Sequence, residues 1–170
     1  YSWLKKDFSY LDGLRRSESH YYETFVRKSE CYGGPLDTDK TVDSEGILSY
    51  IRALRWLHQI TGEEVYLNHL RDALSYEYTF KFCYNSPIQT PPLGRLGWSS
   101  CGGSITSVAN PHIHPMSSTV IDEMLYYLTQ REDGYMIMEG KVGCRNDSVT
   151  VKAFWYRNIR MDNQPAPGLR

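Results

Sequence analysis

The chain has 170 residues, a formal net charge of −1 and an isoelectric point near 6.6. This balance lacks the basic excess with which proteins bind nucleic acid or anionic membranes, so we expect neither partner. No run of about 18 apolar residues and no secretory leader are present, which argues against a transmembrane helix and favours a cytoplasmic protein. The length suits one domain with a sizeable core, spanning residues 1–170.

The two ends of the chain indicate an excerpt from a longer protein. The sequence begins at Tyr1 without an initiator Met and finishes on a polar, proline-rich stretch. Its four cysteines form no CxxC motif, so reduced thiols are expected rather than a zinc ribbon or a disulfide scaffold. They are Cys31, Cys83, Cys101 and Cys144. We predict no cofactor and no bound metal.

The first thirty residues carry apolar side chains near helical spacing and predict a helix in pieces. We expect Gly13 and the polar run 15–19 to interrupt that helix. A breaker containing glycine and proline, at 31–35, ends the region.

A polar stretch, here called the acidic segment (residues 37–45), leads into the next helix. It contains Asp39, Asp43 and Glu45. Either Asp43 or Ser44 is suited to cap the helix, because short polar side chains accept hydrogen bonds from its first backbone N–H groups. Carboxylates at this position also complement the helix dipole.

Two amphipathic helices are predicted next, over residues 46–60 and 64–84. Apolar residues on more than one side of the first, including Ala53 and Trp56, indicate an inner helix. The single apolar stripe of the second indicates an outer helix. Because only a short turn around Gly62 separates them, the two helices should form an antiparallel αα-hairpin.

The long loop, residues 85–116, is the most unusual stretch of the sequence. It combines the run Gly-Trp-Ser-Ser-Cys-Gly-Gly-Ser, from residue 97 to 104, with a His-Ile-His motif at 112–114. Long irregular loops inside helical chains are uncommon and often functional. A helix beginning near Ser117 follows. A short β segment is predicted at 148–156, with the start of a further helix as the alternative.

Two helix ends in the sequence are alike. Residues 57–66 and 128–135 each finish an apolar helix with Leu-x-Gln, pass through an acidic glycine turn and resume at Tyr. Repeated helical pairs bury a continuous core by stacking on one another. The alternative is chance similarity between two helix ends.

On residues 57–67 and, more loosely, 128–135, the chain resembles the (α/α)6-toroid superfamily of six-hairpin glycosidases and polysaccharide lyases. The resemblance covers residues 37–135 and is generic to the superfamily. It implies an all-α fold of αα-hairpin repeats, of which this chain would supply an incomplete ring. The rest of the toroid, or a partner chain, would complete it. The resemblance also implies an active site at the end where the inner helices begin.

Carboxyl groups near that end are the candidate catalytic residues. Glycoside hydrolysis needs two of them, one protonated and one ionised. The acidic segment offers Asp39 and Asp43 for catalysis, with Glu45 as a sugar-binding residue. The alternative for Asp43 and Glu45 is plain helix capping, and Asp39 is harder to explain as a cap.

The long loop offers three further candidates. His112 is a candidate for proton transfer, and His114 for binding a sugar hydroxyl, since imidazole serves either role near neutral pH. Trp98 is a candidate stacking platform for a sugar ring, in a sequence rich in aromatic residues. The alternatives are that the histidines hold the loop together by hydrogen bonds and that Trp98 belongs to the core.

Three functional hypotheses follow from these residues. The first is a glycoside hydrolase that cleaves oligosaccharides or polysaccharides by paired carboxyl groups. The second is a lyase for uronate polysaccharides that uses a His/Tyr pair. The third is a sugar-binding or helical-repeat scaffold without turnover, because fold alone does not imply function.

Overall fold

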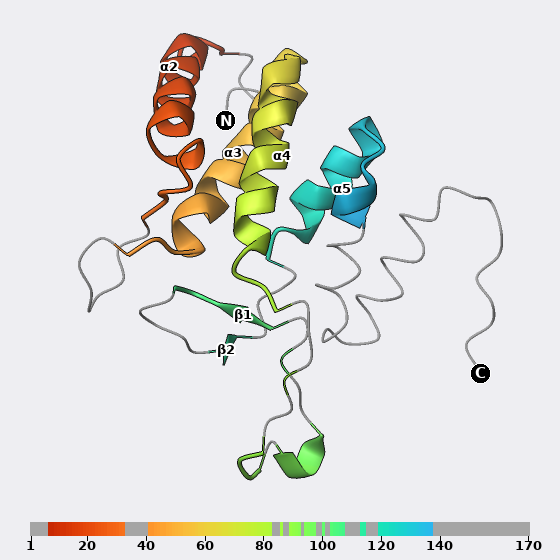
Figure 1. Ribbon diagram of the computed structural model, residues 1–170. Helices are drawn as coiled ribbons and strands as arrows, with labels where there is room; N and C mark the ends of the chain where they lie inside the picture. Colours follow the sequence, from red (N-terminus) through yellow and green to blue (C-terminus); the bar gives the residue numbers. More distant parts are fainter. Residues whose placement is uncertain are drawn as a thin grey trace, which may run out of the picture.

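The computed structural model describes residues 7–32, 41–82, 86, 89–92, 94–97, 100, 103–107, 113–114 and 119–137. Within these residues the protein is mainly helical, as predicted, and strand structure is confined to short backbone pairings (Figure 1). None of the described helices is long and apolar enough to cross a membrane. The β segment predicted at 148–156 lies outside the described residues.

The first described helix, α2 (Leu11–Tyr21), continues directly into a π-helical turn, η1 (Tyr22–Val26). It runs through Gly13 and through the polar run 15–19, so the predicted interruption is wrong. Most of the polar run is solvent-exposed, and only Glu18 of α2 is buried. Because these polar side chains remain in water, they cost the helix little stability.

The predicted αα-hairpin consists of α3 (Glu45–Thr61) and α4 (Glu64–Tyr78). Asp43 Oδ1 accepts the N–H of Gly46 at 2.8 Å and so caps the start of α3. Gly62 ends α3 in the left-handed region at φ +69°, and its N–H donates to the carbonyl of His58 at 2.8 Å. The helix predicted over 46–60 and its glycine stop are confirmed.

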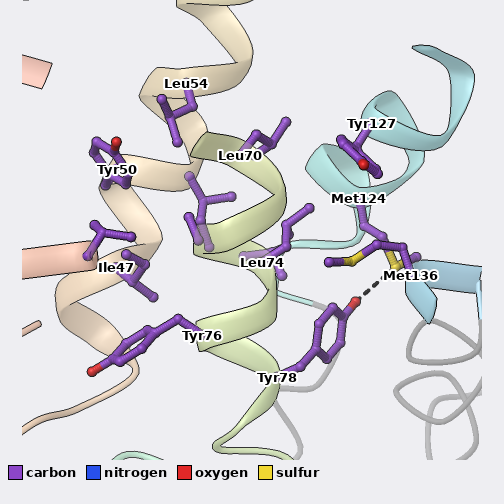
Figure 2. Packing of buried hydrophobic residues seen from close by; sticks show 14 of the residues in the cluster. Ile47, Tyr50, Leu54, Leu70, Leu74, Tyr76, Tyr78, Met124, Tyr127 and Met136 are labelled. Carbon is purple, nitrogen blue, oxygen red and sulfur yellow. Dashed lines mark hydrogen bonds between the residues drawn. The ribbon is translucent and has the colours of Figure 1, made fainter. Parts of the chain in front are cut away.

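A third helix, α5 (Ile121–Gln130), completes the apolar core with this hairpin. Figure 2 shows side chains from all three helices meeting between them. The most deeply buried large side chains, with almost no exposed surface, are Ile47, Ile51, Leu54, Leu67, Leu70, Leu74, Met124 and Tyr127. Burial of apolar surface from three separate helices holds them in one unit.

The helix α4, and not α3, is the more enclosed member of the hairpin. Both helices contact α5 and α2, but eight of the 15 residues of α4 are buried, against six of the 17 residues of α3. The side of α3 that carries Ala53 and Trp56 is exposed, and Trp56 is 59% accessible. The structure therefore reverses the burial expected for an inner and an outer helix within the described residues.

Segments of the long loop pair with the lower end of the hairpin. The strands β1 (Ser104–Ile105) and β2 (Ile113–His114) are antiparallel, with Ser104 opposite His114, and a 3-10 turn, η2, covers Gly94–Leu96. The chain after α4 also pairs with β1: Phe82 donates to the carbonyl of Gly103 at 2.8 Å. This pairing explains why α4 ends at Tyr78 and not at the predicted residue 84.

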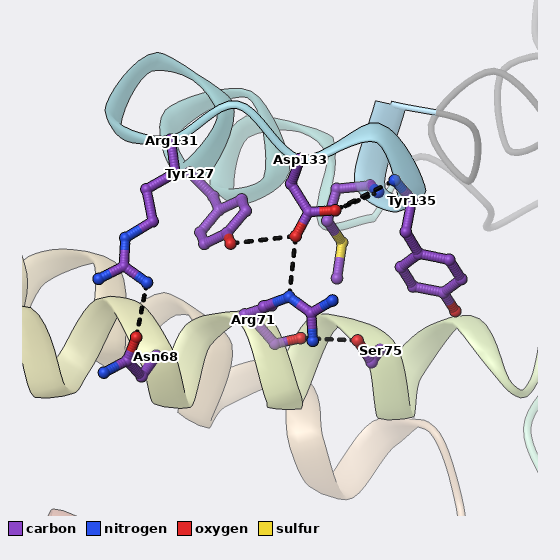
Figure 3. Close-up of polar contacts among 8 residues, drawn as sticks. Asn68, Arg71, Ser75, Tyr127, Arg131, Asp133 and Tyr135 are labelled. Atoms are coloured by element: carbon purple, nitrogen blue, oxygen red, sulfur yellow. Dashed lines mark hydrogen bonds and ion pairs between the residues drawn. The ribbon is translucent and has the colours of Figure 1, made fainter.

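The turn after α5 differs from the turn after α3. Asp133 Oδ1 accepts the N–H groups of Tyr135 (3.1 Å) and Met136 (3.2 Å), while Oδ2 accepts from Arg71 of α4 at 2.8 Å (Figure 3). No left-handed glycine is used, since Gly134 lacks a positive φ. The helix begins at Ile121 and not near Ser117. The two similar sequences thus make helix ends with different turns.

Candidate functional site

The acidic segment and the long loop meet at the start of α3. Ser44 donates its N–H to the carbonyl of Thr106 at 2.8 Å, and Asp43 forms a β-bridge with Ser107. On the other side of the same loop strand, Lys81 forms a bridge with Ser104. Backbone from 43–44, 80–82 and 103–107 is therefore joined into one small platform below the hairpin.

A pocket opens between this platform and the helices. Its walls come from the first turn of α3, the last turn of α4, β1 and the chain that precedes the start of α5. The lining residues are Ser44, Glu45, Leu48, Glu77, Ser104, Ile105, Thr106 and Thr119. Its volume is about 10 Å³, roughly the room that one water molecule needs. A sugar ring would have to lie over the mouth of such a pocket.

Among the predicted site residues, Asp43 and Glu45 lie at this pocket or beside it. Asp43 is 1% exposed, and its capping bond to Gly46 is the structural role considered above. Glu45 is exposed and lines the pocket. The backbone of His114 pairs with Ser104, a lining residue. Asp39, Trp98 and His112 lie outside the described residues.

A buried ion pair, Glu77 with Lys81, adjoins the pocket and was not among the predicted residues. Lys81 Nζ lies 3.0 Å from Glu77 Oε1, and the Lys81 and Glu77 side chains are only 2% and 3% exposed respectively. Glu77 Oε2 has no hydrogen-bond partner among the described residues. Buried carboxylate oxygens are rarely left in this state, so Glu77 calls for an explanation.

The surroundings of Glu77 act on its pKa in opposite directions. Burial raises the pKa, because desolvation disfavours the charged form, and the charge of nearby Asp43 raises it further. The charge and the hydrogen bond of Lys81 lower it. Burial prevails, so the pKa of Glu77 lies above its ordinary value. A carboxyl group with such a pKa can exchange protons closer to neutral pH.

The sequence did carry a signal for this pair. Glu77 and Lys81 continue the buried stripe of Leu70 and Leu74 at helical spacing. Charged residues four apart on a helix are ordinarily a solvated surface pair, which is why they attract no attention in a sequence. Their position on the apolar stripe, and not their spacing, is what indicates burial.

A second polar cluster attaches α2 to the hairpin. Glu18 Oε1 accepts from the Tyr50 hydroxyl at 2.5 Å and lies 2.7 Å from His69 Nδ1. The ring of Tyr22 stacks on His69 at 3.5 Å. Burial and the bond to Glu18 raise the pKa of Tyr50. Both contacts are made by one oxygen of Glu18, and they join α2 to α3 and to α4, so the cluster is explained by docking of α2.

A third polar cluster lies between α3 and α5. His58 Nδ1 lies 2.6 Å from the Tyr126 hydroxyl, and Arg55 lies over the Tyr126 ring at 5.5 Å. Arg55 also lies 3.5 Å from Glu123, while its buried Nε has no partner among the described residues. The pocket at the platform is lined by none of these residues, and their contacts join α3 to α5, so we assign the cluster to helix packing.

Metal and thiol chemistry find no support in the described part of the chain. No group of three or more His, Cys, Asp or Glu side chains converges there as metal ligands would. Cys31 is a buried free thiol whose pKa burial raises to about 11, so it is a poor nucleophile. The other three cysteines lie outside the described residues.

Comparisons with known proteins add no assignment. No protein family, curated protein or solved structure matches the chain.

Proposed function

We propose that this chain is a glycoside hydrolase, or part of one, with its active site at the platform below the α3–α4 hairpin. The observation that carries the proposal is the junction of the acidic segment with the long loop, through the 2.8 Å bond between Ser44 and Thr106. Two stretches that are far apart in sequence, each proposed to contribute to the chemistry, thereby share one location.

In this proposal the acidic segment supplies a carboxylic acid, from Asp39, Asp43 or Glu45. His112, His114 and Trp98 of the long loop position the sugar. The start of α3 supports an anionic site, because the helix dipole stabilises negative charge there. The proposed toroid is supported by the one αα-hairpin, α3 with α4.

The test is turnover by the purified chain on a panel of oligosaccharides and polysaccharides, with products separated by chromatography. We expect hydrolysis products from at least one glycan class. Substitutions Asp39→Asn and Asp43→Asn should identify the acid by a loss of about 10²- to 10⁴-fold in kcat. The side-chain amide oxygen introduced by Asp43→Asn would still accept the Gly46 bond, so this substitution separates capping from catalysis.

The matched control is Asp122→Asn, at an exposed acid in the first turn of another helix, α5. It should leave turnover unchanged. Products that absorb in the ultraviolet would favour the lyase, because elimination creates an unsaturated sugar. Calorimetric binding of a glycan without any product would favour the scaffold. Full activity in Asp39→Asn, Asp43→Asn and His112→Ala would refute the site.

A further inference from the structure

Trp56 of α3 is the most exposed large apolar side chain of the described α-helices. It is 59% exposed, and it is the one exposed large apolar residue of α3 and α5. Ala53, one turn earlier on the same side, is exposed as well and too small to cover the ring. The indole ring of Trp56 is therefore open to a ligand from solution.

Trp56 forms the outer end of a row of three side chains that spans α3 and α5. The Arg55 guanidinium lies 6.0 Å from the centroid of the Trp56 ring and 5.5 Å from that of the Tyr126 ring. The Tyr126 hydroxyl lies 2.6 Å from Nδ1 of the buried His58. Glu123 lies 3.5 Å from Arg55. These contacts fix the row before a ligand arrives, which lowers the entropic cost of binding.

Polar groups flank the ring along the same side of α3. Arg52 lies four residues before Trp56 and Gln59 three residues after it, so both are its neighbours on the helix surface. Both are exposed, and Arg52 forms no ion pair with the described residues. Glu123 balances the charge of Arg55, so Arg52 supplies the uncompensated positive charge beside the ring.

We propose that this surface, here called the α3 face (Arg52, Arg55, Trp56 and Gln59), binds an acidic glycan. A sugar ring stacks on Trp56 through its C–H groups, and a carboxylate of the glycan pairs with Arg52. The amide of Gln59 can donate to and accept from sugar hydroxyls. A protein partner would need several apolar anchors, whereas α3 and α5 expose one large apolar ring.

The α3 face is separate from the candidate active site. Glu45 at the pocket and Trp56 lie about three turns of helix apart, or about 16 Å along the axis of α3. A polymer bound at the α3 face would stay near the protein while another part of it reaches the platform. The choice of a glycan as ligand rests on the proposed glycosidase function.

The test is affinity electrophoresis of the purified chain in gels that contain polygalacturonate. The wild type should be retarded, and Trp56→Ala should weaken binding by at least about tenfold, because the stacking surface is lost. Arg52→Gln should weaken it by about two- to fivefold, as expected for an exposed ion pair, and reduce its salt dependence. The matched control is Phe8→Ala, which removes a ring that is 46% exposed elsewhere and should bind like the wild type.

Two further polymers separate the ring from the charge. Methyl-esterified polygalacturonate keeps the sugar ring without the charge and should bind more weakly, by about two- to fivefold, like Arg52→Gln. Poly-L-glutamate keeps the charge without the ring, so Trp56→Ala should not change its binding. Equal binding of the wild type and Trp56→Ala to polygalacturonate, or no binding by the wild type, would overturn the inference. Equally tight binding of both acidic polymers would also overturn it.

Turnover tests the proposed function separately. Binding through Trp56 without hydrolysis of any glycan would overturn the glycosidase and leave the α3 face standing. Hydrolysis that continues with no binding at Trp56 would do the reverse. Folding of each variant is checked by thermal unfolding. Trp56→Phe keeps an aromatic ring and should retain most of the affinity, and it decides the case in which Trp56→Ala does not fold.

Discussion

The two ends of the α3–α4 hairpin are held together by different means. In the half of the hairpin that leads to the Gly62 turn, buried apolar side chains such as Leu54 and Leu70 fill the space between the helices (Figure 2). At the other end, where Ile47 and Tyr78 are buried too, the buried pair of Glu77 and Lys81 and the backbone platform are added to the apolar contacts. Apolar contacts at the first end account for stability directly, because removal of that surface from water is favourable.

Burial of apolar surface does not explain why the end of the hairpin at the pocket contains a buried ion pair. Burying an ion pair costs desolvation that its attraction often fails to recover, and well-packed apolar residues commonly stabilise as much or more. A protein selected for stability alone has no need of Glu77 and Lys81 here. The contrast teaches that apolar packing accounts for the hairpin, whereas stability alone does not account for the buried ion pair.

The largest expected effect comes from breaking the ion pair on one side. Lys81→Met leaves Glu77 buried without its cation and should lower the free energy of unfolding by about 4 kcal/mol. Urea denaturation measures this loss. The double variant Glu77→Leu/Lys81→Met should recover most of it, since no unpaired charge remains. A double variant as unstable as the single one would mean that the pair is structural after all.

The next effect concerns the apolar end. Leu70 is fully buried, and Leu70→Ala should cost about 3 kcal/mol through lost apolar contacts and the cavity left behind. The same urea titration measures it. Turnover per folded molecule should remain at the wild-type level. Loss of activity in folded Leu70→Ala protein would erase the distinction between the two ends.

A smaller effect is expected at Asp133, which joins the turn after α5 to Arg71 (Figure 3). Asp133→Ala should cost about 1–2 kcal/mol, chiefly through the lost backbone cap. Burial alone would raise the pKa of Asp133, but the bonds from Arg71 and from the N–H of Met136 outweigh it and lower the pKa.

The sign of that shift fixes a pH dependence. With a folded-state pKa below the ordinary 3.8, Asp133 contributes stability that is present above that value and lost as the pH falls through the lower, folded pKa. Acid unfolding followed by circular dichroism should therefore show a shallower decline for Asp133→Asn than for the wild type. Identical acid profiles would contradict the role of Arg71.

The smallest effect is expected at the turn. Gly62 has φ +69° and open space where a Cβ would lie, so Gly62→Ala should cost about 1 kcal/mol from backbone strain alone. Gly13 is the matched control: it lies inside α2 without positive φ or close neighbours, and Gly13→Ala should stabilise by about 0.5–1 kcal/mol. Thermal melts should therefore shift in opposite directions.

Helical patterning predicted the hairpin correctly from sequence alone. Leu54, Leu57 and their neighbours repeat at helical spacing, and Gly62 marks the stop, so local information defined α3. The helix prediction is wrong where a distant segment of the chain forms backbone hydrogen bonds that end the helix. The apolar stripe runs on through Phe82, but backbone pairing with Gly103 ends α4 earlier. Tertiary contacts of this kind leave no trace in local spacing.

Less of the candidate site than of the fold could be predicted from the sequence. The acidic segment and the long loop stood out by composition, and their junction at Ser44 follows from tertiary pairing that no sequence pattern encodes. The short strands β1 and β2 have two residues each, too few for an alternating pattern. The spacing of Glu77 and Lys81 is that of an ordinary exposed helical ion pair, so it does not predict their burial.

The platform below the hairpin also bears on the order in which the molecule assembles. The α3–α4 contacts are local, since only a short turn separates the helices, whereas the bonds from Ser44 to Thr106 and from Phe82 to Gly103 close long stretches of chain. Loop closure of that length is entropically costly and slows folding. The hairpin should therefore form first and the pocket last, and in native-state hydrogen exchange the amides of Ser44 and Phe82 should exchange before that of Leu70.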